Sequence, residues 1–283
     1  MSVIRRLETH PPTYTQIGLP GVKAVSGLAT QPITGTIFAS TGYGDGGKLY
    51  TLDPATGQLT LVGDPAAALA IPGLTFDPAT GVLYAVVALT NGGERSLGTL
   101  DPTDGTLSLI DPITLGGQPT IGVHAPLFER GRLRFSTGSA YSGGAGIGEL
   151  DPTTGEVLSF QTFPGVTTTI AGLTITADDR VLGSTGAGEG KLYEFDLASG
   201  TATLIVDLAT VRAGRVGPRQ RRRCRQRRRR TWGGQLPQRP PATQSARAAS
   251  AAIERSPGAS TWNDASVRGS ISVSYPSWIF GRV

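Results

Sequence analysis

The chain has 283 residues, of which 40 are Gly, 20 are Pro and one is Cys, and its formal net charge is +5 at pH 7. A single cysteine excludes an internal disulfide framework, and the absence of any apolar run of about 18 residues excludes a membrane-spanning helix. High Gly and Pro content with many short, alternating apolar segments indicates an all-β chain with many turns.

The first 14 residues are predicted to be a leader that precedes the folded part of the chain. They contain two arginines and no apolar segment of the signal-peptide type, so we expect no signal peptide in this chain. The residues that follow, 15–211, carry a repeated pattern. This pattern predicts a repeat domain over 15–211.

The pattern is clearest in Lys48–Gly63, which reads KLYTLDPATGQLTLVG. Two alternating segments with β propensity flank the turn that runs from Asp53 to Gly57. We expect the Asp53 carboxylate to accept a hydrogen bond from the backbone N–H two residues later. We also expect Pro54 to restrict φ and Gly57 to take a positive φ. The segment is therefore predicted to be a β-hairpin.

The same hairpin recurs along the chain, and an independent motif recurs with it. The turns begin at Asp53, Asp101, Asp151 and Asp196, and a Gly followed by Leu or Val precedes them at 27–28, 73–74, 122–123 and 172–173. Each unit holds about four strands, and a four-stranded antiparallel unit of about 40–50 residues is typical of a β-propeller blade. We predict blades at 24–63, 72–111, 121–161 and 170–206.

At LYTLDPATGQLTLVG and GLTFDPATGVLYAVV the chain resembles bacterial β-propeller repeat proteins with LYxLDPxTG hairpins. These include the YVTN-type and quinoprotein-dehydrogenase-like propeller superfamilies. The resemblance covers residues 15–206 and implies a propeller fold. Members of this broad group include scaffolds and surface proteins as well as dehydrogenases and lactonases, whose metal or quinone ligands lie on inner strands and loops. Similar propellers are often extracytoplasmic, whereas the compartment of this chain stays open.

The propeller is predicted to be incomplete. Thr15–Gly18 (TQIG) is similar to the end of a later hairpin, Leu61–Gly63, and so is expected to be the outermost strand of a blade. The other three strands of that blade are not found next to it in the sequence. We therefore expect about four blades plus an orphan strand, and self-association through the open blade edges.

The tail, residues 212–283, differs in kind from the rest of the chain. Residues 1–211 have a net charge of −9, whereas residues 212–283 contain 16 Arg, no Lys and two acids, a net charge of +14. Such a segment is predicted to be disordered. Arg221–Arg230 is either a basic arm for nucleic acid or the product of a frameshift in a GC-rich gene. Nucleic-acid binding is expected only if this segment is genuine.

No catalytic, cofactor-binding or metal-binding residue is assigned, and no cofactor is expected. Each Asp-Pro turn offers one carboxylate, which lacks the alternating oxygen ligands of a calcium loop. Asp178 and Asp179 are interpreted as a solvated turn, and the glycine-rich segments Gly143–Gly148 and Gly186–Lys191 as blade loops. Cys224 is interpreted as an unpaired thiol. Of the two histidines, His10 lies in the leader and His124 on an expected inner strand facing the channel.

These observations favour a non-enzymatic binding or structural platform. It would present the loops of one rim and a shallow channel to a protein, a glycan or a small ligand. The alternative is a degenerate or truncated propeller enzyme of the calcium-lactonase or quinoprotein-dehydrogenase kind. We expect such an enzyme to bind Ca²⁺ or a quinone and to gain thermal stability from it.

Overall fold

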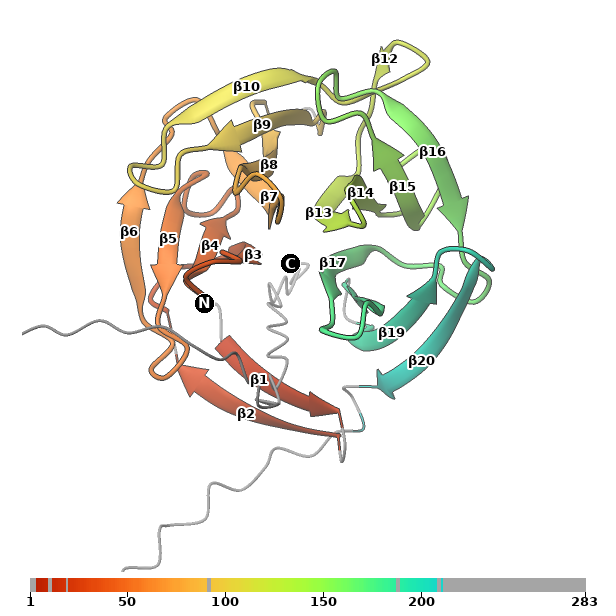
Figure 1. The fold of residues 1–283 in the computed structure, drawn as a ribbon, viewed down its shortest axis with the longest axis horizontal. Coiled ribbons are helices and arrows are strands. Elements are labelled where there is room, and N and C mark those ends of the chain that lie inside the picture. The colour runs from red at the N-terminus through yellow and green to blue at the C-terminus, as the bar shows by residue number, and fades with distance from the viewer. Residues whose placement is uncertain are drawn as a thin grey trace, which may run out of the picture. The chain divides into compact units, whose positions relative to one another are not determined.

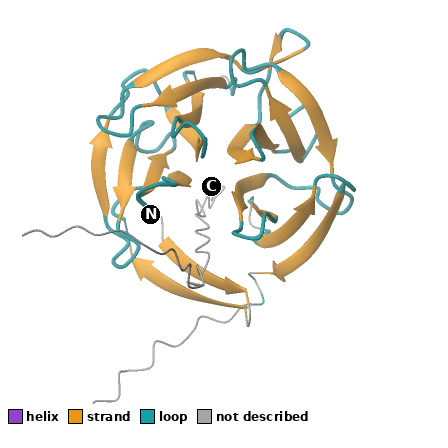
Figure 2. Cartoon of the chain, viewed as in Figure 1, coloured by secondary structure: helices purple, strands orange, loops and turns teal. Residues whose placement is uncertain are grey.

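The computed structural model describes residues 4–9, 12–18, 20–90, 93–186, 189–207 and 210. In this part of the chain sixteen strands form four antiparallel sheets of four strands each, arranged as the blades of a β-propeller (Figure 1). Figure 2 shows that strands and the loops between them make up the blades. The predicted fold class is confirmed. The predictions made for His10, Cys224 and residues 212–283 lie outside the described residues.

The four blades are continuous in the chain, and each strand pairs with the next one in sequence. Blade 1 consists of β3 (Val25–Thr30), β4 (Ile37–Thr41), β5 (Leu49–Leu52) and β6 (Leu59–Gly63). Blade 2 consists of β7 (Ala70–Phe76), β8 (Leu83–Ala88), β9 (Ser96–Leu100) and β10 (Leu107–Pro112). Blade 3 consists of β13 (Val123–Glu129), β14 (Arg132–Thr137), β15 (Gly146–Leu150) and β16 (Val157–Thr162). Blade 4 consists of β17 (Ile170–Ile175), β18 (Val181–Thr185), β19 (Lys191–Asp196) and β20 (Thr201–Asp207). A small hairpin, β11 (Thr114–Leu115) and β12 (Gln118–Pro119), connects blades 2 and 3. The blade boundaries differ from the predicted ones by at most two residues.

The Asp-Pro turns form as predicted. The N–H of Ala55 donates to Oδ1 of Asp53 at 2.8 Å, and Gly57 has a φ of 73°. The Thr56 hydroxyl also donates to Oδ2 of Asp53, at 2.6 Å, so the threonine of the motif uses the second carboxylate oxygen. Each turn therefore satisfies its own carboxylate, which explains why Asp and Thr recur together.

The turn glycine has a second role that the sequence did not reveal. A Cβ on Gly57 would lie 2.8 Å from the Cα of Gly18, and a Cβ on Gly105 would lie 2.7 Å from the Cα of Gly63. Real Cβ atoms do not approach backbone so closely. The end of an outer strand thus rests on the turn of the following blade, and only glycine leaves room for that contact.

The first turn of blade 3 lacks the Asp-Pro motif that forms the first turn of blade 2. Glu129 pairs with Arg132, which leaves a two-residue loop of Arg130 and Gly131 with φ values of 50° and 75°. Two consecutive positive φ values are typical of the tight turn that matches the twist of paired strands. This turn therefore closes the first hairpin of blade 3 without an Asp-Pro motif.

The apolar core lies between blades rather than within them. One cluster joins blades 1 and 2 and includes Phe38 and Phe76, whose ring centroids are 5.6 Å apart. A second cluster joins blades 2 and 3 around Phe135, and a third joins blades 3 and 4 around Phe195. Each blade therefore depends on its neighbours for burial, as predicted for blades around a channel.

A two-stranded sheet, β1 (Ile4–Thr9) and β2 (Pro12–Gly18), lies between blade 4 and blade 1 (Figure 1). The prediction that Thr15–Gly18 is an outer strand with no local partner needs correction, because β1 pairs with β2 directly. Both strands begin within residues 1–14, which the sequence analysis treated as a leader. The strand gives little alternation to detect, because its sequence, IRRLET, holds only two apolar residues, Ile4 and Leu7.

The hairpin connects the two ends of the blade series. Ile4 belongs to a cluster with residues of blade 1, and Leu7 belongs to a cluster with residues of blade 4. The blade 1 residues in the cluster of Ile4 are Val25, Ala39 and Leu52. The blade 4 residues in the cluster of Leu7 are Leu182, Leu192 and Val206. Among the described residues the hairpin thus supplies two strands of a fifth blade, and no inner strands accompany them.

Candidate functional site

The two faces of the propeller differ in composition because of the strand order. One face carries the tight turns inside each blade, such as Asp53–Gly57 and Asp101–Gly105. The other carries the longer loops between the second and third strands, residues 42–48, 89–95, 138–145 and 186–190. We call these the turn face and the loop face. The starts of the inner strands also lie on the loop face, because Val123 pairs with Thr137 at the end of β14.

The turn face has carboxylates, but their hydrogen-bonding capacity is used within the turns. The Thr103 hydroxyl, followed by the Thr103 N–H, lowers the pKa of Asp101 below its usual value, and the Thr56 hydroxyl does the same for Asp53. These groups are exposed and satisfied. They give the turn face no free ligand set for a cation.

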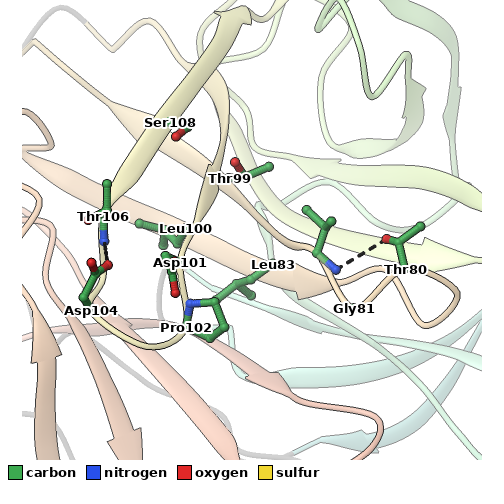
Figure 3. Close-up of a pocket in the computed structure, with 11 residues that line it drawn as sticks. Thr80, Gly81, Leu83, Thr99, Leu100, Asp101, Pro102, Asp104, Thr106 and Ser108 are labelled. Carbon is green, nitrogen blue, oxygen red and sulfur yellow. Dashed lines mark hydrogen bonds between the residues drawn. The ribbon is translucent and has the colours of Figure 1, made fainter.

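A pocket of about 490 Å³ opens on the turn side of blade 2 (Figure 3). Its lining includes Asp101, Asp104, Thr99 and Ser108, and the Asp104 carboxylate accepts a hydrogen bond from the Thr106 N–H at 2.8 Å. The polar groups drawn there thus serve the local turns. No buried, unpartnered polar atom lines this pocket, so we do not place the candidate site in it.

The loop face contains a buried cation. Arg95 lies in the loop before β9, and the residue is only 8% exposed. Its Nη1 donates to the carbonyl of Gly93 at 2.6 Å and to that of Glu94 at 3.2 Å, and lies 3.4 Å from the hydroxyl of Tyr43 in the corresponding loop of blade 1. Its Nε is buried and has no hydrogen-bond partner among the described residues. The loops of two blades thus meet at this guanidinium.

Arg134, an arginine that is only partly buried, shows what is missing at Arg95. Nε of Arg134 is also without a partner, but its other nitrogens lie 2.9 Å from Glu149 and 3.5 Å from Glu129. Two carboxylates therefore compensate the charge of Arg134. No ion pair forms between Arg95 and a carboxylate in the described part of the chain, and its neighbour Glu94 is exposed.

His124 lies on β13, the inner strand of blade 3, as predicted. Its ring is near the start of the loop after β14, since a Cβ on Gly138 would lie 3.1 Å from Nε2. Burial, and next the charge of Arg95, lowers the pKa of His124 to about 4. The imidazole is therefore neutral at physiological pH. We call Tyr43, Arg95 and His124 the Arg95 cluster.

The structure also places the other candidates from the sequence. Asp178 pairs with Arg180 at 2.8 Å in the first turn of blade 4, which agrees with a solvated turn. Gly143–Gly148 runs from the loop of blade 3 into β15, and Gly186–Lys191 runs into β19, so a strand rather than a helix follows each glycine-rich segment. Residues 187 and 188 lie outside the described part.

Metal clusters and membrane-spanning helices are both absent from the described residues. These residues contain no group of three or more His, Cys, Asp or Glu side chains arranged to hold a metal ion. They also contain no helix that is long and apolar enough to span a membrane.

Sequence reasoning identified His124 but missed Arg95 and Tyr43. The available signal was weak: Arg95 is the only arginine in the sequence of the four long loops, residues 42–48, 89–95, 138–145 and 186–190. An arginine in a Gly-rich loop is usually solvated, and only the tertiary structure shows that this one is buried.

No protein-family model matches the sequence, and a search of curated proteins finds no match. Similar solved structures include a PQQ-bound aldose sugar dehydrogenase from Streptomyces coelicolor, with 18% identity, a TM-score of 0.43, and coverage of 69% of this chain and 64% of that one. A gluconolactonase from Xanthomonas campestris has 13% identity and a TM-score of 0.46, with coverage of 71% and 84%. A nidogen/laminin complex has 10% identity and a TM-score of 0.49, with coverage of 72% and 76%.

These likenesses concern the propeller fold at low sequence identity. The chain spans less than two thirds of the length of the dehydrogenase, at 64%, and 66% of the length of one further solved structure. The matched structures thus include a sugar dehydrogenase, a gluconolactonase and a nidogen/laminin complex.

Proposed function

We propose that this chain is a non-enzymatic binding platform that holds its ligand on the loop face of the propeller. The difference between the two faces carries this proposal. On the turn face the repeated motif satisfies its own polar groups, as the hydrogen bonds of Asp53 with Ala55 and Thr56 illustrate. On the loop face the four long loops vary in sequence, and one of them carries Arg95, a buried cation that forms no ion pair with a carboxylate of the described residues.

The loop face also has the properties that support recognition. Its loops are held in place: the Asp45 carboxylate accepts hydrogen bonds from the N–H groups of Lys23 and Ala24 at 2.7 and 2.9 Å, and Glu189 pairs with Lys191 at 2.7 Å. Variable loops on a rigid β scaffold are a common location for binding residues. A ligand bound there loses little free energy to ordering the loops.

The test is to map ligand binding on the full chain by amide NMR. A defined panel of monosaccharides, short oligosaccharides and small carboxylates is titrated separately, and changes in the amide signals are assigned to either face. We expect at least one compound to shift signals in loops 42–48, 89–95 or 138–145. Changes confined to the turn face, or no saturable change with any compound, would contradict the proposal. A rise in melting temperature with Ca²⁺ or a quinone would instead support the enzymatic alternative.

A further inference from the structure

The hairpin of β1 and β2 leaves one strand edge without a partner among the described residues. β2 takes the outer position, because Gly18 lies against the turn of blade 1 as Gly63 of β6 lies against the turn of blade 2. β1 therefore corresponds to the third strand of a blade, on the channel side of β2 (Figure 1). In the four complete blades the third strand pairs on both sides, whereas β1 pairs only with β2. An unpaired edge is a template for a further strand.

The free edge of β1 carries a row of backbone hydrogen-bonding groups. In an antiparallel pair every second residue directs its N–H and C=O to the partner strand, and the residues between direct theirs away from it. Ile4 and Leu7 are 1% and 4% exposed, so β1 lies in the apolar interior at these positions. Buried backbone groups are almost always hydrogen-bonded. A strand on the channel side of β1 would satisfy these groups.

The second strands of the complete blades show which residues the position next to β1 accepts. Three of these four strands, β4, β14 and β18, read IFAST, RLRFST and VLGST. The Ser and Thr residues that end them are at most 8% exposed. This position therefore holds short strands in which hydroxyl and apolar side chains are both buried.

The sequence beyond residue 210 contains one segment of this kind. Ser270–Tyr275 reads SISVSY, in which serine alternates with residues that favour strands, and it carries no charge. No other uncharged run of this length in 211–283 alternates in the same way. The segment thus matches the composition of β4, β14 and β18.

The path and the charge of the chain favour this segment over a second copy of the protein. Val206, near the end of β20, belongs to the same cluster as Leu7, so the chain leaves blade 4 beside β1. A flexible linker of about 60 residues, the length before Ser270, spans roughly 40 Å. Residues 1–211 have a net charge of −9 and residues 212–283 one of +14, so these two parts attract each other. The blade regions of two copies would repel each other.

We propose that Ser270–Tyr275 adds to the free edge of β1 and takes the position of the second strand of a fifth blade. Its backbone groups pair with those of β1. Its alternating side chains face blade 4 on one side and blade 1 on the other. The innermost position, next to β17, is not filled by this strand. This inference is independent of the proposed function, which concerns the loop face.

Amide hydrogen exchange of the full chain, resolved by NMR, tests this inference. The β1 amides that are directed to β2 exchange slowly in either case and serve as an internal reference. The amides directed to the free edge exchange slowly only if a strand pairs there. We therefore expect slow exchange along the whole of β1 and within Ser270–Tyr275. An alternation of slow and fast amides along β1 would overturn the inference.

Three variants identify the strand that pairs with β1. Val273→Pro removes a backbone donor, and we expect the free-edge amides of β1 to exchange about tenfold faster or more, while those directed to β2 stay slow. Val273→Ile keeps an apolar, β-branched side chain and should leave exchange unchanged. Ala251→Pro places proline elsewhere in 211–283 and should also leave it unchanged.

The variants also define the results that contradict the proposal. Slow exchange along the whole of β1 that survives Val273→Pro would overturn it, because another segment or molecule then covers the edge. Free-edge amides that become fast on dilution would overturn it in favour of a second copy. Equal effects of Val273→Pro and Ala251→Pro would overturn the assignment of the strand to Ser270–Tyr275.

Discussion

The junction between blades 1 and 2 and the junction between blade 4 and blade 1 are built from the same repeat but differ in completeness. At the first, inner strand β7 is almost wholly buried against its neighbours. At the second, only Ile170 of inner strand β17 is buried, and its other residues are half-buried. The difference teaches that an inner strand is well covered where inner strands of neighbouring blades lie on both sides of it, as β3 and β13 do for β7.

The outer parts of the two junctions are alike. Gly18 of the hairpin lies against the turn glycine Gly57, just as Gly63 lies against Gly105. The hairpin therefore reproduces the outer half of a blade contact, including its backbone proximity. The two junctions differ only on the channel side, where the described residues supply no inner strands after β17.

The largest expected difference concerns matched leucines on inner strands. Leu74 on β7 is 4% exposed and packs between blades 1 and 2, whereas its counterpart Leu173 on β17 is half-buried. We expect Leu74→Ala to lower the free energy of unfolding by about 2–5 kcal/mol and Leu173→Ala by about 1 kcal/mol. Denaturant unfolding of the full chain measures both. Equal losses would show that β17 is as well covered as β7.

A second comparison uses pH. The unfolded chain binds a proton at His124 below pH 6.5, whereas the folded chain does so only near pH 4. Stability should therefore fall as pH decreases from 6.5 to 4, by up to about 3 kcal/mol from this residue. His124→Gln should remove that part of the pH dependence. The control is Ala171→His at the equivalent position of β17, where we expect a histidine with a pKa closer to its ordinary value.

The difference in unfolding free energy between wild type and His124→Gln, measured at several pH values, isolates this contribution from that of the carboxylates. A constant difference from pH 7 to pH 4 would show that the His124 ring stays accessible to water in the folded chain.

Turn glycines allow the backbone contact between blades to be separated from turn strain. Gly105 and Gly81 have φ values of 77° and 75°, but only Gly105 faces a neighbouring backbone, and a Cβ on Gly81 would meet nothing within 4 Å. We expect Gly81→Ala to cost about 1 kcal/mol of stability and Gly105→Ala about 2–3 kcal/mol. Thermal or denaturant unfolding distinguishes them.

The same substitution at Gly57 tests how firmly the hairpin is attached. If β2 is held as tightly as β6, Gly57→Ala should cost as much as Gly105→Ala. A cost equal to that of Gly81→Ala would mean that the hairpin moves aside without loss of other contacts.

The smallest expected effect concerns a hydroxyl between blades. Ser136 donates to the carbonyl of Ile170 in the next blade at 2.7 Å and accepts from the N–H of Ala125 at 3.0 Å. Ser184 occupies the equivalent position of blade 4 and makes no such bond to another described blade. We expect Ser136→Ala to cost about 1–2 kcal/mol, because it leaves buried backbone groups unsatisfied, and Ser184→Ala to cost almost nothing. Denaturant unfolding of the two variants measures both losses of unfolding free energy. Equal losses for Ser136→Ala and Ser184→Ala would contradict this expectation.

The candidate site was less predictable than the fold. His124 was placed on an inner strand because it follows a recurring Gly-Val pair. Arg95 gave no comparable signal, since its importance depends on the loop of blade 1 reaching it through Tyr43 and on the absence of a carboxylate partner. Those are contacts between residues 52 positions apart in the chain. Local patterns cannot report them.

The sequence by itself determined the strands, the Asp-Pro turns, the number of complete blades and the propeller architecture, because these follow from alternation and from turn chemistry within a few residues. Only the tertiary structure decided that Ile4–Thr9 is a strand, that Gly57 must admit Gly18, and that Arg95 is buried. The physical reason is that burial and close backbone approach depend on neighbouring blades, which the chain brings together only after it has folded.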